Sequence, residues 1–590
     1  MPTHTAPHRL LADLAAAWRV RPVRLGLLGT FLIALGALSP AYLPRASSWW
    51  QWLTPLHANG TAWRVGGTIL TMLGALLLVD AWFRLRPASL REDDRHPHRG
   101  LKANLLSWWQ SINSAPVVAT DEGKPLLCRG WAVLFWWALP LLVAPPVFSQ
   151  DAYSYAAQGW IVHNGLDPYA VGPGMLPGSF ADQVASEWRM TPAPYGPLSL
   201  QISHLLVVVC GYSPYLSAWA QRLPALLGVV MIGFFLPRIA RQMRVDEHLA
   251  VWFALLNPML VISFIGGAHN DALMMGFVVA GIWVAGLGLG HGDGSSGPPL
   301  DRRAERRFGL GLDHRLQPTQ GAQAPSSPHN TLHGPPGQAA AVSSAQVDVP
   351  PPSAPRSSPL WWLLGAVVVG IGATIKQPAV LTALALPLIT RPWASWAWRD
   401  TLITAGRVIA SLATSVATFC LITVATRLGF GWVNSVSVPG RSLTAAPFTM
   451  VGLAVEHVVG WFGVTLDQTH TVAMARLAGI VIGALLIAFL ALTLARRRPI
   501  AFLAWGYLAA ALCAPALRTW YVQWSVTLLP LTHMSATMVR VAVWGTLVMF
   551  GFDAMYMSMR NSAVAVGVGA LLAMAWVAWN HLPLLDRRKP

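Results

Sequence analysis

The sequence predicts an all-α membrane protein that crosses the bilayer many times. Of its 590 residues, 54% are hydrophobic and only 11% are charged, whereas a soluble chain carries about 25% charged residues. The charged residues gather in short patches between long apolar runs. Many of those runs reach the roughly 20 residues that a helix needs to cross a bilayer. We therefore expect a polytopic helical bundle.

The apolar runs predict about 14 transmembrane helices. They lie approximately at residues 24–44, 63–84, 131–148, 214–236, 249–267, 272–290, 360–375, 379–390, 407–427, 473–495, 499–516, 521–536, 540–557 and 562–580. The run at 379–390 is short. It follows a break at Lys376-Gln377-Pro378 and ends at Arg391, so we count it as a span.

Basic residues cluster at alternate ends of these spans, which places both termini in the cytoplasm because cytoplasmic loops collect Lys and Arg. The clusters are Arg19, Arg21 and Arg24; Arg84, Arg86, Arg91, Arg95, Arg99 and Lys102; Arg238, Arg241 and Arg244; Arg302, Arg303, Arg306 and Arg307; Arg496, Arg497 and Arg498; and Arg587, Arg588 and Lys589. A net charge of +17 would suggest nucleic-acid binding in a soluble protein. Here the cytoplasmic loops account for the charge, so no nucleic-acid partner is expected.

One apolar segment, Leu198–Cys210, is too short to be counted as a span. Counting it would place Arg238, Arg241 and Arg244 outside, against the positive-inside rule. We therefore expect this segment to lie along the outer surface of the membrane as an interfacial helix.

The same reasoning divides the chain into five parts. They are N-terminal spans at residues 1–148, an extracytoplasmic loop with interfacial helices at 149–213, further spans at 214–290, a linker at 291–359, and C-terminal spans with outer loops at 360–590. The linker is rich in Pro, Ser, Gly and Gln. It cannot bury enough apolar surface to offset its ordering entropy, so we expect it to be disordered and cytoplasmic.

Most of the unusual polar residues fall in six stretches that this topology places at the outer ends of the spans. The stretches are Ser149–Tyr169, Thr191–Ser199, Gly266–Met275, Ile375–Ala379, Asn434–Pro447 and Ala516–Trp524. The cytoplasmic ends show little beyond Arg and Lys. The polar chemistry is therefore expected at the extracytoplasmic rim of the hydrocarbon.

Several of these residues also have simpler structural explanations. The tyrosines of the outer stretches could belong to an interfacial aromatic belt, and Asn270 and Asp271 could cap the span that follows them. Lys376 could snorkel to the membrane surface, and Arg518 could pair with a lipid headgroup. His269 is expected to be structural because no second His or Cys lies at metal-ligand spacing. We expect no metal and no cofactor.

Asp151 is harder to explain structurally. It closely follows the apolar run Trp131–Phe148, and a carboxylate at a span end is costly without a partner or a role. One carboxylate, several cations and outward-facing aromatic residues suit glycosyl transfer from a lipid phosphate. Unlike the alcohol of a glycoside, a phosphate leaving group needs no general acid. One base can then deprotonate the acceptor hydroxyl, while cations stabilise the leaving phosphate.

Six stretches also resemble a known family. They read SQDAYSYAAQGWIVHNGLDPYAVGP, TPAPYGPLSLQIS, GAHNDALMMG, IKQPA, WVNSVSVPGRS and LRTWYVQW. In spacing and order they resemble the actinobacterial polyprenol-phosphomannose-dependent α-1,6-mannosyltransferases, the MptA/MptB family of lipomannan biosynthesis. The resemblance runs from about residue 131 to about residue 536, and the stretches GAHNDALM and TPAPYGP favour the MptB branch.

The resemblance implies a GT-C fold, in which a transmembrane bundle carries an outer loop with the catalytic carboxylate, here Asp151. It implies polyprenyl-phosphate mannose as the donor, a lipid-anchored mannan as the acceptor, and inversion at the anomeric carbon. The candidates for binding the donor phosphate are Lys376, Arg518 and Arg441. The candidates for binding sugar or acceptor are Tyr153, Tyr155, Asp167, Tyr169, Tyr195, His269, Asn270, Asp271, Trp520 and Tyr521.

Two other functions stay open from the residues alone. A transporter or flippase would place polar residues near the membrane midplane, often at broken helices, whereas here they gather at one face. Another transferase that uses a lipid-phosphate sugar, such as a protein mannosyltransferase or an arabinosyltransferase, would share the fold and the base.

Overall fold

Among the residues that the computed structural model describes, every regular element is a helix, which confirms the all-α class. These residues are 6–44, 46–47, 50, 52–55, 60–87, 130–289, 358–435, 444, 446–534, 536–559 and 561–581. The helices belong to one unit made of Met1–Gly288 and Pro359–Pro590. Leu289–Ser358 form a separate unit, and the predicted disordered linker lies almost entirely outside the described residues.

Among the described residues, five helices are long and apolar enough to cross a membrane, as expected for a membrane protein. They are α5 (Gly60–Arg84), α12 with α13 (Pro214–Ala220 and Arg222–Gln242), α15 with η7 (Asp271–Gly286 and Leu287–Leu289), α19 (Trp398–Thr426), and α22 with η10 (Gln468–Leu490 and Ala491–Ala495). A bent pair, Glu247–Leu255 with Leu260–Gly266, makes up to six.

Other predicted spans correspond to helices outside this set of five. These are α2 (Arg21–Gly36), α7 (Gly130–Val143), α17 (Pro359–Ala373), η8 with α18 (Gln377–Leu384 and Leu386–Thr390), α23 (Pro499–Cys513), α25 (Ala536–Met559) and α26 (Ala563–His581). The run at 521–536 was expected to form one helix. It forms instead the end of η11 (Thr519–Tyr521), α24 (Val522–Val526) and η12 (Leu529–Leu531). The total of about 14 spans therefore stays a prediction.

Two further helices lie outside the predicted spans, one before the first span and one between two later spans. The first, α1 (Ala6–Trp18), comes before α2 and contacts α7. The second, α21 (Pro447–Gly460), packs against α22. It was not among the predicted spans.

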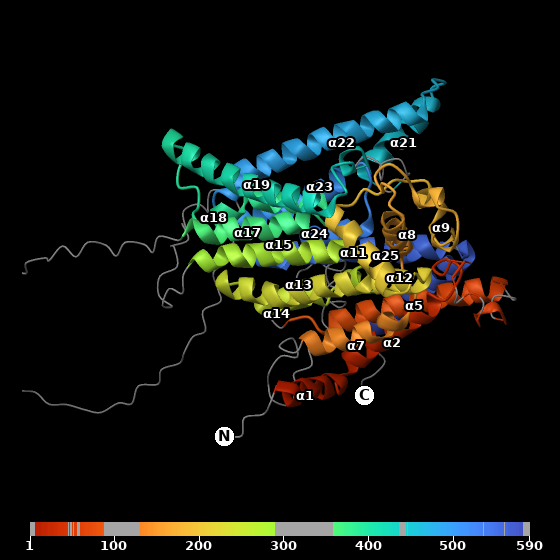
Figure 1. Cartoon of the computed structure of the whole chain (residues 1–590). Coiled ribbons are helices and arrows are strands. Elements are labelled where there is room, and N and C mark those ends of the chain that lie inside the picture. The colour runs from red at the N-terminus through yellow and green to blue at the C-terminus, as the bar shows by residue number, and fades with distance from the viewer. Residues whose placement is uncertain are drawn as a thin grey trace, which may run out of the picture. The chain divides into compact units, whose positions relative to one another are not determined.

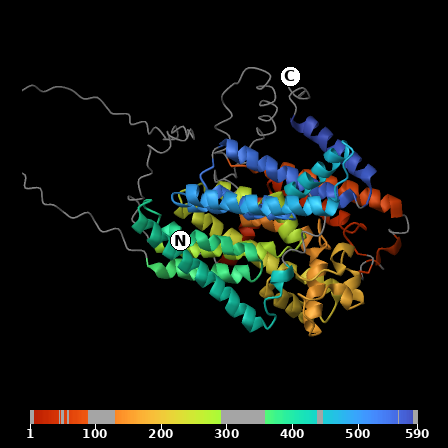
Figure 2. The same cartoon turned by 90° about the horizontal axis from the view of Figure 1, so that it is seen from above.

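The long helices run roughly parallel to one another (Figures 1 and 2). In both views, α8 (Asp151–His163) and α9 (Ser179–Asp182) lie at one end of this bundle. The end of α15 and the start of α17, which flank the linker, lie at the opposite end. Small residues let α15 and α17 approach closely: a Cβ on Gly365 would lie 2.7 Å from the carbonyl oxygen of Gly281. Such contacts are typical of helix pairs in membranes.

The bent pair consists of α14 (Glu247–Ala250), η5 (Val251–Leu255) and η6 (Leu260–Gly266), with a bend of 56°. The helix breaks at Asn257-Pro258, where proline lacks the backbone N–H that a continuous helix requires. The Asn257 Oδ1 accepts hydrogen bonds from the backbone of Met259 at 2.9 Å and from Gln523 Nε2 at 3.3 Å. The break was not predicted. Beyond it, η6 leads directly into the polar stretch at residues 266–271.

A pair of indoles fixes the first half of the bent pair against α5. Trp82 donates to the carbonyl of Trp252, and Trp252 donates to the carbonyl of Trp82, each at 2.8 Å. Their rings stack with centroids 4.6 Å apart. Both side chains are fully buried, so these reciprocal bonds satisfy two donors that would otherwise be unpaired in the interior.

The loop after α7 carries α8, η4 (Pro173–Met175), α9, α10 (Ser186–Arg189) and α11 (Pro197–Val209). The helix predicted at Leu198–Cys210 is present as α11, and it packs against α8. Gly196, just before α11, touches the chain after α17: its N–H bonds the carbonyl of Ile375 at 3.2 Å. A Cβ on Gly196 would lie 2.2 Å from the carbonyl oxygen of Thr374. This close approach sets Tyr195 beside Lys376.

Candidate active site

Five segments that are far apart in the sequence converge beside the start of α8. They contribute Asp151, Tyr155, Tyr195, the stretch His269–Asp271, Lys376, and the stretch Arg518–Trp524. Each segment belongs to one of the outer-face stretches that the sequence singled out. The structure thus brings residues from five of these six stretches together.

Asp151 is the first residue of α8, and its backbone N–H donates to Ser149 Oγ at 3.1 Å. Its Oδ2 lies 3.7 Å from Nδ1 of His269, and the side chain is 18% exposed, so a ligand can reach it. Burial raises the pKa of Asp151, and the cations of Arg518 and Lys376 partly oppose that rise. The group is thus an accessible carboxylate whose basicity is increased by its surroundings.

Two residues with positive φ precede the site residues Asp151 and His269. Phe148 has φ 57° and Ala268 has φ 56°, a region that side chains other than glycine rarely adopt. Each such residue costs about 1–3 kcal/mol and persists where the surrounding structure holds it. Phe148 is held by stacking against Tyr42 and Phe550. These turns direct both chain segments toward the site.

His269 is 1% exposed and stacks on Trp520 with ring centroids 3.7 Å apart. Burial, followed by the charges of Lys376 and Arg518, holds the pKa of His269 well below its usual value. The imidazole is therefore neutral. Its Nδ1 also lies 3.4 Å from the hydroxyl of Tyr155, so this nitrogen can either donate toward Asp151 or accept from Tyr155.

Lys376 forms an ion pair with Asp271, with Nζ 2.9 Å from Oδ1 and 2.8 Å from Oδ2. Trp524 Nε1 donates to the same Oδ1 at 2.7 Å, and Nζ lies 4.3 Å from the ring centre of Tyr521. The Asp271 side chain is fully buried. Burial lowers the pKa of Lys376, but Asp271 and the other neighbours raise that pKa by more than burial lowers it. The net shift is upward, and the ammonium stays charged.

This ion pair bears on two interpretations of the sequence. Lys376 does not snorkel to the surface, because it is buried against Asp271. Asp271, which was a candidate for binding sugar or acceptor, is a second carboxylate close to Asp151. Their environments differ: Asp271 is saturated by Lys376 and Trp524, whereas Asp151 keeps an exposed edge.

The capping role considered for Asn270 and Asp271 is wrong. Asn270 occupies the N-cap position of α15, but no side-chain hydrogen bond caps the helix there. Its Nδ2 donates instead to Ser199 Oγ on α11 at 3.2 Å. Asn270 therefore ties the start of α15 to the outer loop.

Arg518 is partly exposed, and its guanidinium carbon lies 5.0 Å from the ring centre of Trp188 on α10. The charge of Arg518 lowers the pKa of Asp151, as the charge of Lys376 does, so both cations belong to the same site. The third predicted cation, Arg441, lies outside the described residues.

Three of the predicted sugar-binding residues make contacts within the loop at residues 149–213. Tyr153 is 1% exposed and packs in a separate apolar cluster with Ala157 and Phe180. Tyr169 donates to the carbonyl of Tyr195 at 3.1 Å. Asp167 is exposed, and its Oδ1 accepts from the backbone of Tyr169 at 2.8 Å.

Tyr155 and Tyr195, in contrast, form part of the wall of the site. Their rings meet edge to face at 5.0 Å, and Tyr195 lies 5.9 Å from the Lys376 ammonium. Tyr521 stacks on Trp524 at 4.6 Å. The aromatic-belt explanation therefore fails for Tyr155, which is 4% exposed.

Sequence reasoning missed Ser149 and Trp524, although both lie within the stretches that it selected. Trp524 comes four residues after Trp520, a spacing that brings side chains to the same face of a helix. That spacing was the available signal. Within the described part of the chain, no group of three or more His, Cys, Asp or Glu residues could hold a metal ion.

Fold and site together define a class of protein: a helical membrane protein that holds an accessible carboxylate, two cations and aromatic walls at one end of its bundle. Residues 23–395 match the family model described as "alpha-(1->6)-mannopyranosyltransferase, N-terminal domain". The chain belongs to the MptA/MptB family of α-(1→6)-mannopyranosyltransferases.

Curated relatives agree with this assignment. An α-(1→6)-mannopyranosyltransferase of Mycobacterium tuberculosis is 30% identical over 78% of this chain and 76% of its own length. A probable α-(1→6)-mannopyranosyltransferase of Mycolicibacterium smegmatis is 27% identical over 89% and 90%, respectively. The α-(1→6)-mannopyranosyltransferase A of M. tuberculosis is 25% identical over 90% and 84%. No solved structure matches the chain.

Proposed function

We propose that this protein transfers mannose from polyprenyl-phosphate mannose to a lipid-anchored mannan on the outer face of the membrane, forming α-1,6 linkages with inversion. The observation that carries the proposal is the accessible Asp151 carboxylate beside Lys376 and Arg518. Membership of the family supports mannosyl transfer. The donor, the acceptor and the inverting course follow from the chemistry of the site and from the resemblance described above.

The proposed reaction is a single displacement. Asp151 accepts the proton of the acceptor's primary hydroxyl as that oxygen attacks the anomeric carbon of mannose. The bond between this carbon and the phosphate oxygen breaks, and the polyprenyl phosphate leaves with the electron pair. Attack opposite to a β-linked phosphate yields the α-linked product. Asp271 is not suited to this role because Lys376 and Trp524 already occupy it.

The two cations have complementary parts in this proposal. Arg518 is partly exposed, and a guanidinium binds phosphate oxygens bidentately. Lys376 is buried and shares its charge with Asp271, so it presents the phosphate with a fixed and partly neutralised positive group. Preorganised charges of this kind act on the negative charge that grows on the leaving oxygen.

The direct test uses the purified protein in lipid nanodiscs with polyprenyl-phosphate mannose and a short mannan acceptor. Linkage analysis of the product is expected to show new α-1,6 bonds. Polyprenyl-phosphate arabinose serves as the matched donor, and a protein that used it instead would be a different lipid-phosphate transferase. Movement of the donor across a vesicle membrane without transfer to any acceptor would identify a flippase and contradict the proposal.

The pH dependence of transfer is expected to follow Asp151. Only the carboxylate form accepts a proton, so kcat/KM falls as the pH decreases through its pKa, which burial has raised. The charge of Arg518 lowers that pKa. In Arg518→Gln the acidic limb of the profile is therefore expected to move to higher pH. An acidic limb at the same pH in both proteins would remove Arg518 from the electrostatics of the base.

The proposed topology predicts opposite labelling of two engineered cysteines in a cysteine-free background. Ala170 is exposed in the loop that carries Asp151, and a cysteine there is expected to react with a membrane-impermeant thiol reagent in intact cells. A cysteine at Ser326, in the linker outside the described residues, is expected to react only with a permeant reagent. Labelling of position 326 from outside would overturn the topology and the mechanism with it.

A further inference from the structure

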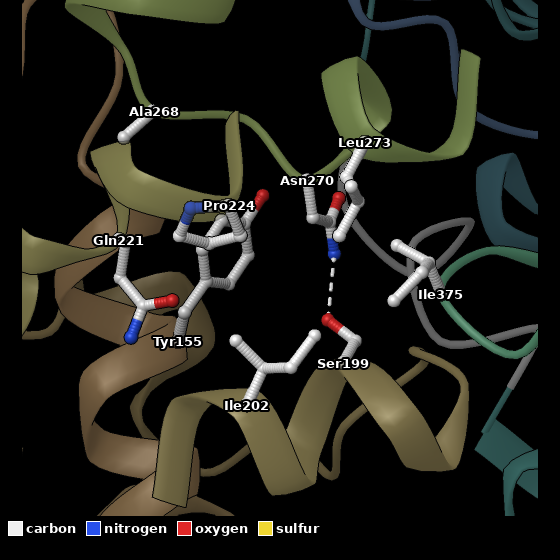
Figure 3. A pocket seen from close by; sticks show the side chains of 9 residues that line it. All are labelled: Tyr155, Ser199, Ile202, Gln221, Pro224, Ala268, Asn270, Leu273 and Ile375. Carbon is white, nitrogen blue, oxygen red and sulfur yellow. Dashed lines mark hydrogen bonds between the residues drawn. The ribbon is translucent and has the colours of Figure 1, made fainter. Parts of the chain in front are cut away.

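A small cavity lies beside the candidate active site, between α8, α11, the start of α13 and the start of α15 (Figure 3). Tyr155 and Gln221 stand on one side of it, and Asn270 stands on the other, bonded to Ser199. Its other described lining side chains are apolar, and none of the described lining residues is Asp, Glu, Lys or Arg. The cavity is thus neutral but rich in hydrogen-bonding groups.

Two of these groups have no hydrogen-bond partner among the described residues. They are the side-chain oxygen Oδ1 of Asn270 and the side-chain nitrogen Nε2 of Gln221. Both side chains are more than nine-tenths buried. Each amide uses its other polar atom: Asn270 Nδ2 donates to Ser199, and Gln221 Oε1 accepts from Ser203 at 3.3 Å. Both residues line the cavity, and each keeps one polar atom without a partner among the described residues.

A hydroxyl group can satisfy either of these atoms, because it donates one hydrogen bond and accepts others. The free space is about 10 Å³, which is room for roughly one water-sized group. A phosphate would be larger and would lack a cation there. The cavity also adjoins the reacting groups: Asn270 follows His269 in the chain, and the Tyr155 hydroxyl lies 3.4 Å from His269 Nδ1.

We propose that this cavity is a specificity pocket that receives one hydroxyl group of a saccharide, with Asn270 and Gln221 as the recognising residues. The proposal rests on the proposed mannosyl transfer, and it adds which chemical group of the substrate the protein recognises. The hydroxyl belongs to the donor mannose or to the acceptor sugar, and both would present the same chemistry. A sugar lacking that hydroxyl leaves a buried polar atom of the pocket unmatched in the bound state.

The test compares two series of substrates, donors each lacking one mannose hydroxyl and acceptors each lacking one hydroxyl other than the attacking one. With the wild-type protein, one member of one series is expected to lose roughly ten- to hundredfold in kcat/KM, the scale for a buried group left unmatched. The series that contains it identifies the source. In Gln221→Leu and Asn270→Leu, which remove the recognising atoms, that same analogue is expected to react as well as the complete sugar.

Gln201→Leu is the matched control, since Gln201 is an amide on α11 whose Nε2 bonds the carbonyl of Thr426 at 2.9 Å, away from the cavity. It is expected to keep the wild-type discrimination. Wild-type protein that transfers mannose but discriminates against no analogue, or variants that discriminate as the wild type does, would show that the cavity holds only water. A wild-type protein that transfers no mannose at all would overturn the proposed function, and this pocket's assignment with it.

Discussion

Asp151→Asn is expected to lower the rate of mannosyl transfer by roughly 10²–10⁴, the scale for loss of a general base. The amide has nearly the same shape but cannot accept the proton of the acceptor hydroxyl. Because the Asp151 side chain is partly exposed and its Oδ2 lies 3.7 Å from Nδ1 of His269, beyond hydrogen-bond distance, folding is expected to be unaffected. The measurement is initial transfer rate with purified protein at saturating donor.

Asp182→Asn provides the matched control. Asp182 is an exposed carboxylate in the same loop, at the end of α9, and its replacement is expected to leave the rate unchanged. Size-exclusion profiles and thermal unfolding of both variants would verify that the fold is retained. Transfer by Asp151→Asn at a rate near that of the wild type would exclude Asp151 as the base.

Loss of Lys376 is expected to produce the second large effect, and it acts on stability as well as on catalysis. Removing one partner of a buried ion pair leaves the other charge uncompensated and typically costs about 3–5 kcal/mol. Lys376→Met therefore leaves the carboxylate of Asp271 buried, with Trp524 as its remaining side-chain donor among the described residues. We expect a clearly lower unfolding temperature together with a reduced turnover number.

The double variant Asp271→Asn/Lys376→Met separates these two effects. With both charges removed, stability is expected to return toward that of the wild type. Turnover is expected to stay at least about tenfold lower, because a group that stabilises developing negative charge is typically worth more than that. A stable double variant with wild-type turnover would show that Lys376 serves only to neutralise Asp271. Arg518→Gln has no buried ion pair to break, so its catalytic effect can be read directly.

The sequence predicted which residues approach the site better than it predicted what they do there. Asp151, His269, Lys376 and Trp520 were selected because each lies at the outer end of an apolar run, and such ends share one face of a bundle. Hydropathy says nothing about which neighbours meet within that face. The pairing of Lys376 with Asp271 could therefore not be foreseen.

Tyr153 shows where the available signal was not used. Residues two apart on a helix point to different sides, so Tyr153 and Tyr155 were not both able to reach one ligand. The structure places Tyr155 at His269 and Tyr153 in a separate apolar cluster. Helical spacing alone would have divided the pair.

For the fold, apolar length predicted the continuous helices well and the broken ones poorly. Residues 63–84 and 407–427 correspond to α5 and α19, which cover them almost completely. Residues 249–267 and 521–536 were also predicted as spans, but they bend or divide into short helices. Hydropathy measures composition, whereas continuity depends on residues such as Pro258, which interrupts the backbone hydrogen bonds.

The ion pair between Lys376 and Asp271 also bears on competition within the membrane. Anionic phospholipids are abundant at membrane surfaces, and an unpaired lysine would attract their headgroups. Here a visiting phosphate must compete with a carboxylate that already holds the ammonium through both oxygens. A ligand that offers charge alone gains little from that exchange. We infer that a phosphate-bearing ligand occupies this site only when its sugar makes additional contacts. Bulk lipid then acts as a weak inhibitor, even where it greatly outnumbers the donor.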